Sequence, residues 1–188
     1  MALYYNNANI AQSANVLINN KACNNVYYNN ALVWKKSFNI LAQASWSTVS
    51  QTTDGAGTPD NYGTARRNGD GSLHVSAFNG GRAGWAYWTL GPVSTRGYNY
   101  INIYIPISVS AGANGILVGN WYLQFVNGDG SVAQWLKNDS PPTIPTTYNG
   151  IVAAVNQYDS VYVRFGVQGS ATGQGGTTEA TCYRLQLE

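Results

Sequence analysis

The sequence predicts an all-β protein in two parts, a small N-terminal segment of β-hairpin repeats (1–37) followed by one jelly-roll β-sandwich (38–188). Three observations lead to this prediction. A short motif with an Asn-Asn pair recurs three times before residue 34, apolar and polar residues alternate with period two in most later segments, and no segment shows helical periodicity. The 188 residues, 44% of them hydrophobic, suffice for one full core with a small addition.

The N-terminal repeat has three copies, LYYNNANI (3–10), VLINNKAC (16–23) and VYYNNALV (26–33). Each copy has three apolar residues, an Asn-Asn pair, two variable residues and a further apolar residue. Asn tolerates left-handed backbone angles, so each pair is interpreted as a two-residue turn between two very short strands. Single hairpins of this size are not stable alone. The segment is therefore expected to stack on itself, on the sandwich or on neighbouring chains.

From Phe38 onward, longer apolar segments alternate with loops rich in Gly and Asn. Nine candidate strands follow from this pattern: 38–50, 72–79, 84–91, 98–109, 115–126, 131–137, 150–156, 160–168 and 179–187. Nine strands without a helix are typical of a sandwich or a barrel.

Two of the connections share the sequence NGDGS, at 68–72 and 127–131. Each offers a single carboxylate, whereas calcium loops supply several oxygen ligands in succession. Both are therefore predicted to be hairpin turns, and the sequence indicates no metal site.

Alternation predicts which side chains face the core. Inward positions on four strands hold Ile101, Ile103, Ile105 and Ile107; Leu117, Trp121, Leu123 and Phe125; Val161, Val163, Phe165 and Val167; and Tyr183, Leu185 and Leu187. The outward positions between them hold Tyr98, Tyr100, Asn102 and Tyr104; Asn120, Tyr122 and Gln124; Tyr162, Arg164 and Gln168; and Cys182, Arg184 and Gln186. One of Trp85 and Trp88 is also expected in the core, because they lie on opposite faces of their strand.

The outward positions point to contact with a partner, because exposed strands usually carry Thr, Lys, Glu and Ser there. Phenol rings can stack on sugar rings, and amides and guanidinium groups can bind hydroxyls. An interface with another subunit, or plain surface, fits the same composition. The candidate ligand or interface residues are Tyr100, Asn102, Tyr104, Asn120, Tyr122, Gln124, Tyr162 and Arg164. Asp60, Tyr62, Arg66 and Arg67 join them, from a Gly-rich stretch (54–71) interpreted as a binding loop.

Several function classes are disfavoured. A net charge of +2 spread along the chain argues against nucleic acid, and no apolar run is long enough for membrane insertion. Most of the eight acidic residues lie in turn-like sequence, and His74, the single histidine, has no nucleophile or metal motif around it. The sequence thus predicts a protein that is not an enzyme and needs no cofactor.

The repeat ends in Val33-Trp34 and resembles the short β repeats that open many tailed-bacteriophage virion proteins. Residues 38–188 resemble, more loosely, the galactose-binding-like jelly rolls of carbohydrate-binding modules and phage appendages, in the order of the strand patterns and the closing CYRLQLE. The resemblance implies a virion component made in the host cytoplasm. Residues 3–36 would contact other virion proteins, and the jelly roll would face outward.

The function expected from these features is attachment to host-surface polysaccharide or decoration of the particle. Many copies on one particle would let weak contacts add up, and a homo-oligomer is expected. Two alternatives remain open: a purely architectural capsid decoration or tail component without a ligand, and a carbohydrate-binding module outside any virus.

Overall fold

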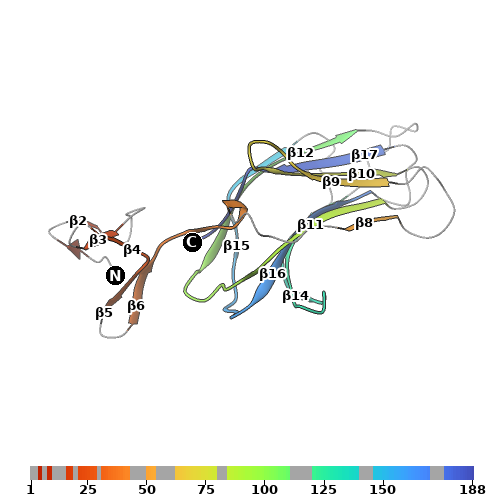
Figure 1. Cartoon of the computed structure of the whole chain (residues 1–188). Helices are drawn as coiled ribbons and strands as arrows, with labels where there is room; N and C mark the ends of the chain where they lie inside the picture. The colour runs from red at the N-terminus through yellow and green to blue at the C-terminus, as the bar shows by residue number, and fades with distance from the viewer. Residues whose placement is uncertain are drawn as a thin grey trace.

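The computed structural model describes residues 4–5, 8–9, 16–18, 21–28, 31–42, 50–53, 62–79, 84–110, 120–139, 146–169 and 176–188. These residues are almost entirely β-strand, so the predicted all-β class is confirmed. Small hairpins lie at one end and a two-layered sandwich at the other, with the C-terminus where the two meet (Figure 1). The one helical element of the described residues is a 3₁₀ turn, η2 (Ile40–Ala42), and none of their helices is long and apolar enough to cross a membrane.

The N-terminal segment forms the three predicted hairpins. Their strands are β1 (Tyr4–Tyr5) with β2 (Ala8–Asn9), β3 (Val16–Ile18) with β4 (Lys21–Cys23), and β5 (Asn25–Tyr28) with β6 (Ala31–Lys35). In each pair the last residues in register flank an Asn-Asn pair, as Ile18 pairs with Lys21. This register confirms the two-residue connections, although the Asn residues themselves lie outside the described residues.

The sandwich has a seven-stranded and a five-stranded sheet. The seven-stranded sheet contains β7 (Phe38–Asn39), β9 (Tyr62–Arg67), β10 (Leu73–Asn79), β12 (Tyr100–Ser110), β15 (Thr146–Ala154), β17 (Gly176–Cys182) and β18 (Arg184–Leu187). The five-stranded sheet contains β8 (Ser50–Thr53), β11 (Gly84–Val93), β13 (Asn120–Val126), β14 (Val132–Asp139) and β16 (Val161–Gln168). Among strands β10 to β17, the order is β10-β17-β12-β15 in the seven-stranded sheet and β11-β16-β13-β14 in the five-stranded sheet. Along the chain, each of these strands is followed by a strand of the other sheet, except that β14 follows β13 in the same sheet. This confirms the predicted jelly roll.

The core lies between the inner faces of the two sheets. The four isoleucines of β12 are at most 2% exposed, and Trp121, Phe125 and Phe165 are fully buried. The predicted inward positions are thus confirmed on β12, the described part of β13, and β16, whereas Leu117 lies outside the described residues. Of Trp85 and Trp88, one of which was predicted in the core, Trp88 is the buried one.

A bulge between β17 and β18 overturns one part of the alternation. Ala180 pairs with Ile107 and Arg184 with Tyr104, so four steps along one strand match three along its neighbour. The extra residue reverses the phase. Cys182 is fully buried and Tyr183 is 48% exposed, the opposite of the prediction, and the predicted strand 179–187 is two strands.

Two further predictions are corrected. Residues 62–67, expected in a binding loop, form β9, because they pair with β10 across the turn at 68–72. Of the expected strand 38–50, residues 38–42 form the short β7 followed by η2, and Ser50 belongs to β8, while residues 43–49 lie outside the described residues.

The two NGDGS turns are confirmed as hairpin connections, and they have the same hydrogen bonds. In the first, Ser72 donates its backbone N–H and its hydroxyl to Asp70 Oδ1, at 2.9 and 2.6 Å. Ser131 and Asp129 make the same pair of bonds in the second turn. Hydrogen bonds from the serine side chain lower the pKa of each aspartate. Each carboxylate is thus used within its own turn.

The third hairpin contacts the sandwich at the turn before β12. Lys35 Nζ lies 3.9 Å from the centre of the Tyr98 ring and donates to the backbone carbonyl of Arg96. Gly97 has a φ of 79°, and a Cβ there would lie 2.6 Å from Leu32 Cδ2. Tyr98, predicted to face outward, is therefore only 5% exposed, because it lies beneath Lys35 before the strand begins.

The alternation on β12 can be tested with two neighbouring substitutions. Ile103→Ala should lower the free energy of unfolding by about 2–5 kcal/mol, because it leaves a cavity between the sheets. Tyr104→Ala, on the exposed face, should cost less than about 1 kcal/mol. Chemical denaturation followed by tryptophan fluorescence measures both values, and equal losses would contradict the assigned faces.

Candidate functional site on the outer face of the five-stranded sheet

The structure separates the predicted site residues into two groups. Tyr100, Asn102 and Tyr104 belong to β12 in the seven-stranded sheet, whereas the residues from β13 and β16 belong to the five-stranded sheet. The outer faces of a sandwich point in opposite directions. The phenol and amide side chains therefore form two surfaces and cannot act as one platform.

The five-stranded sheet has a hollow of about 310 Å³ on its outer face. It brings together four predicted residues, Asn120, Tyr122, Gln124 and Arg164. The strand register explains their proximity, since Gly166 pairs with Tyr122 on one side and Tyr87 on the other, and Gln168 pairs with Asn120 and Trp85. The full lining is Trp85, Tyr87, Asn120, Tyr122, Gln124, Val132, Trp135, Arg164 and Gln168.

Tyr122 forms the floor of the hollow by lying over a glycine. A Cβ at Gly166 would be 2.5 Å from Tyr122 Oη and 2.7 Å from Tyr87 Cβ, so the ring fits only because residue 166 has no side chain. Tyr122 is 6% exposed. Burial raises the pKa of Tyr122 well above its usual value, although Arg164 opposes the shift. The phenol therefore stays neutral and can both donate and accept a hydrogen bond.

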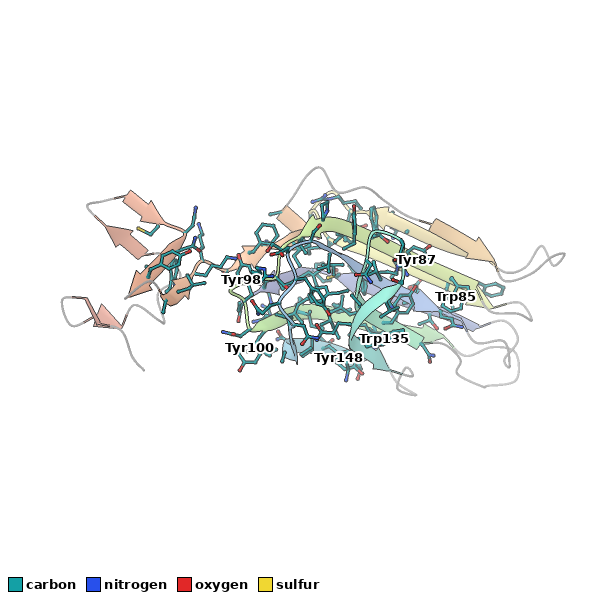
Figure 2. The ribbon with its side chains drawn as sticks, turned by 90° about the horizontal axis from the view of Figure 1, so that it is seen from below. Trp85, Tyr87, Tyr98, Tyr100, Trp135 and Tyr148 are labelled. Carbon is teal, nitrogen blue, oxygen red and sulfur yellow. The ribbon has the colours of Figure 1, made fainter. Side chains whose placement is uncertain are left out.

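Two tryptophans flank this floor. The Trp85 and Trp135 rings each have their centroid 6.4 Å from that of Tyr122, in edge-to-face arrangements of 64° and 75°. Trp135 is 53% exposed, while Trp85 is half-buried. Figure 2 shows Trp85 and Tyr87 farther from the hairpins than Tyr98 and Tyr100. The hollow thus offers aromatic surface from β11, β13 and β14.

Arg164 is the cationic group among the lining residues. Its guanidinium lies 5.0 Å from the centre of the Tyr87 ring, and Nη1 donates to Gln124 Oε1 at 3.4 Å. Its buried Nε has no hydrogen-bond partner among the described residues. The hollow combines aromatic surface with amide, phenol and guanidinium groups, and its lining contains no carboxylate.

The remaining predicted residues lie elsewhere. Tyr162 is on β16 near Gly91 and does not line the hollow. Arg66 lies on β9, where it pairs with His74 of β10. Arg67 Nη2 donates to the Leu41 carbonyl at 2.6 Å, which links β9 to η2. Asp60 lies outside the described residues, as does the side chain of Tyr62.

Sequence reasoning missed several lining residues. Trp85 and Tyr87 could have been found, because the alternation that buries Trp88 places both on the outer face. Gln168 was predicted to face outward but was not assigned to the site. Trp135 could not be assigned, because two register shifts between β13 and β14 interrupt the period-two pattern there.

Comparison with solved structures finds partial similarities. The enzymatically active domain of tailspike protein 4 from bacteriophage CBA120 has a TM-score of 0.45 and 14% identity, over 77% of this chain and 20% of that chain. A variant of a family 29 carbohydrate-binding module has a TM-score of 0.38 and 15% identity, over 77% and 92% of the two chains. The C-terminal family 6 carbohydrate-binding module of the laminarinase LamC from Zobellia galactanivorans has a TM-score of 0.30 and 12% identity, over 77% and 97%.

No protein-family model and no curated protein matches the chain. Because the TM-scores of these structural similarities lie below 0.5, they identify neither a ligand nor an activity for this protein.

The floor of the hollow can be tested at Gly166. Gly166→Ala should displace the Tyr122 ring and lower the free energy of unfolding by about 1–3 kcal/mol, because the new methyl group overlaps two tyrosines. Gly128→Ala is the matched control, since a Cβ there would meet nothing within 4 Å. Denaturant titration of both variants measures the difference, and a Gly166→Ala protein as stable as the control would refute this packing.

Proposed function

We propose that the outer face of the five-stranded sheet binds the sugar rings of an uncharged glycan. The observation that carries this proposal is the arrangement of Trp85 and Trp135 around the Tyr122 floor. The faces of pyranose rings carry C–H groups, which pack well on aromatic side chains, while ring hydroxyls need hydrogen-bond partners. This hollow offers both kinds of contact within one small space.

Specific side chains can be assigned to each kind of contact. Trp135 has the most exposed ring of the hollow, so it would receive a sugar face first. Gln124 and Arg164 already share a hydrogen bond and would orient a hydroxyl together. Tyr122 would add a neutral phenol.

The proposed role is binding without hydrolysis. Glycoside hydrolysis needs two carboxyl groups on either side of the scissile bond. The residues that line the hollow contain aromatic, amide and guanidinium groups, which hold a sugar but cannot provide that acid and base pair. The chain would then serve as an attachment module.

Binding can be tested by affinity electrophoresis in gels containing glucan, mannan, galactan or xylan. At least one polysaccharide should retard the wild-type chain. Trp135→Ala should weaken that binding by about ten-fold, equivalent to about 1.4 kcal/mol, and Trp135→Phe should weaken it less. Tyr27→Ala is the control, because Tyr27 is 61% exposed on the third hairpin, away from the hollow. Equal retardation of the Trp135→Ala and wild-type chains would overturn the assignment.

We further infer that the hairpin segment attaches the jelly roll to a virion. Its resemblance to phage β repeats supports this location, as does the exposed cross-strand pair of Tyr27 and Leu32 on the third hairpin, at 61% and 38% exposure. Immunogold labelling of purified particles of the phage that carries the gene should find the chain on the particle surface. Its absence from those particles would favour a carbohydrate-binding module outside any virus.

A further inference from the structure

The outer face of the seven-stranded sheet has a hollow of its own, of about 260 Å³. It lies where the four central strands β10, β12, β15 and β17 meet. The side chains that define it are His74, Pro106, Ser108, Thr147, Glu179 and Thr181. It is therefore on the opposite side of the sandwich from the hollow around Tyr122.

The polar groups of this second hollow are already held in place. His74 Nδ1 lies 3.0 Å from Thr181 Oγ1, and the hydroxyl of Ser76 donates to Glu179 Oε1 at 3.2 Å. Burial lowers the pKa of His74, Arg66 lowers it further, and Glu179 opposes the shift. The neutral imidazole uses Nδ1 on Thr181, so a ligand would meet Nε2, while Glu179 supplies acceptor oxygens.

Exposed tyrosines lead into this hollow. Tyr104 lies two residues before Pro106 on the same face of β12, and its ring centre is 5.6 Å from that of Tyr183, at an interplanar angle of 38°. Tyr183 reaches this face only because of the bulge between β17 and β18. Tyr100 continues the aromatic strip, four residues or on the order of 13 Å further along the strand. The three rings are between 38% and 48% exposed.

Two buried polar atoms beside the strip lack partners among the described residues, Asn102 Oδ1 and Arg184 Nε. Another group of each side chain is engaged. Asn102 Nδ2 donates to Glu188 Oε1 at 3.0 Å, and Arg184 Nη2 donates to Asn149 Oδ1 at 2.6 Å. Both side chains are thus held in place beside the strip by bonds within the protein.

We propose that this surface is a second glycan-binding site, which takes an uncharged oligosaccharide along β12. One sugar unit would stack on Tyr104 and Tyr183, and a neighbouring unit would enter the hollow between His74 and Glu179. A second copy of the chain would have to fill a polar hollow as well as cover the rings, so a sugar fits the observations better. The ligand class rests on the proposed function, but the site has its own residues and its own test.

The single histidine of the chain provides a direct probe, because its ring proton resonances report on this hollow alone. We would titrate the 188-residue Trp135→Ala chain with hexasaccharides of glucose, mannose, galactose and xylose. At least one should shift the His74 resonances in a saturable manner. Adding Tyr104→Ala should weaken that affinity by about ten-fold, whereas adding Tyr104→Phe or Tyr27→Ala should not.

The outcomes separate this proposal from the first one. His74 resonances that do not move with any of the four sugars would overturn the second site and leave the first unaffected. If Trp135→Ala leaves polysaccharide binding unchanged while the sugars still shift the His74 resonances, the first site would be overturned and the second supported. If Tyr104→Ala instead lowers the mass measured by sedimentation and leaves the His74 shifts unchanged, the tyrosine strip is an interface between copies and the proposal is wrong.

Discussion

The structure depends on the burial of two apolar sheet faces against each other. Each fully buried isoleucine or phenylalanine contributes about 1.5–3 kcal/mol relative to the exposed state, and β12 alone buries four isoleucines. A slip of one residue in register would turn this row to solvent and bring Tyr100, Asn102 and Tyr104 into the core. Core burial therefore fixes the outer face as firmly as the inner one. Both proposed sites consist of side chains whose orientation is imposed by what lies behind them.

Each outer surface also depends on a local feature that period-two alternation does not describe. On the five-stranded sheet, Gly166 leaves room for the Tyr122 ring over β16, and Trp85 and Trp135 flank that ring. On the seven-stranded sheet, the bulge at Tyr183 adds a ring that regular pairing would have buried. A missing side chain makes room for the floor of one surface, and an extra residue adds a third ring to the two tyrosines of the other.

These features mark the limit of what the sequence could predict. Period-two alternation was sufficient for the fold class, for the buried positions of β12, β13 and β16, and for Asn120, Tyr122, Gln124 and Arg164 as outward side chains. Alternation contains no information on which strands share a sheet. It therefore could not show that Tyr100 and Tyr122 lie on different sheets, on opposite faces of the sandwich. The bulge, which is set by pairing with β12, and the contact of Lys35 with Tyr98 join segments distant in sequence. The irregular pairing of Trp135 lies within the β13–β14 hairpin, but its register shifts leave no mark in the period-two pattern. No local pattern encodes them.

The position of the hairpins bears on how the two surfaces can be used. The third hairpin contacts the sandwich through Lys35, at the turn that contains Arg96 and Tyr98 and immediately precedes β12. This contact involves neither the hollow around Tyr122 nor the one around His74, and in Figure 1 the hairpins extend from the end of the sandwich. A chain held through its hairpins would therefore keep both outer faces open. Two back-to-back glycan sites on such a chain would engage two separate polysaccharide strands, and many copies on one particle would multiply these weak contacts.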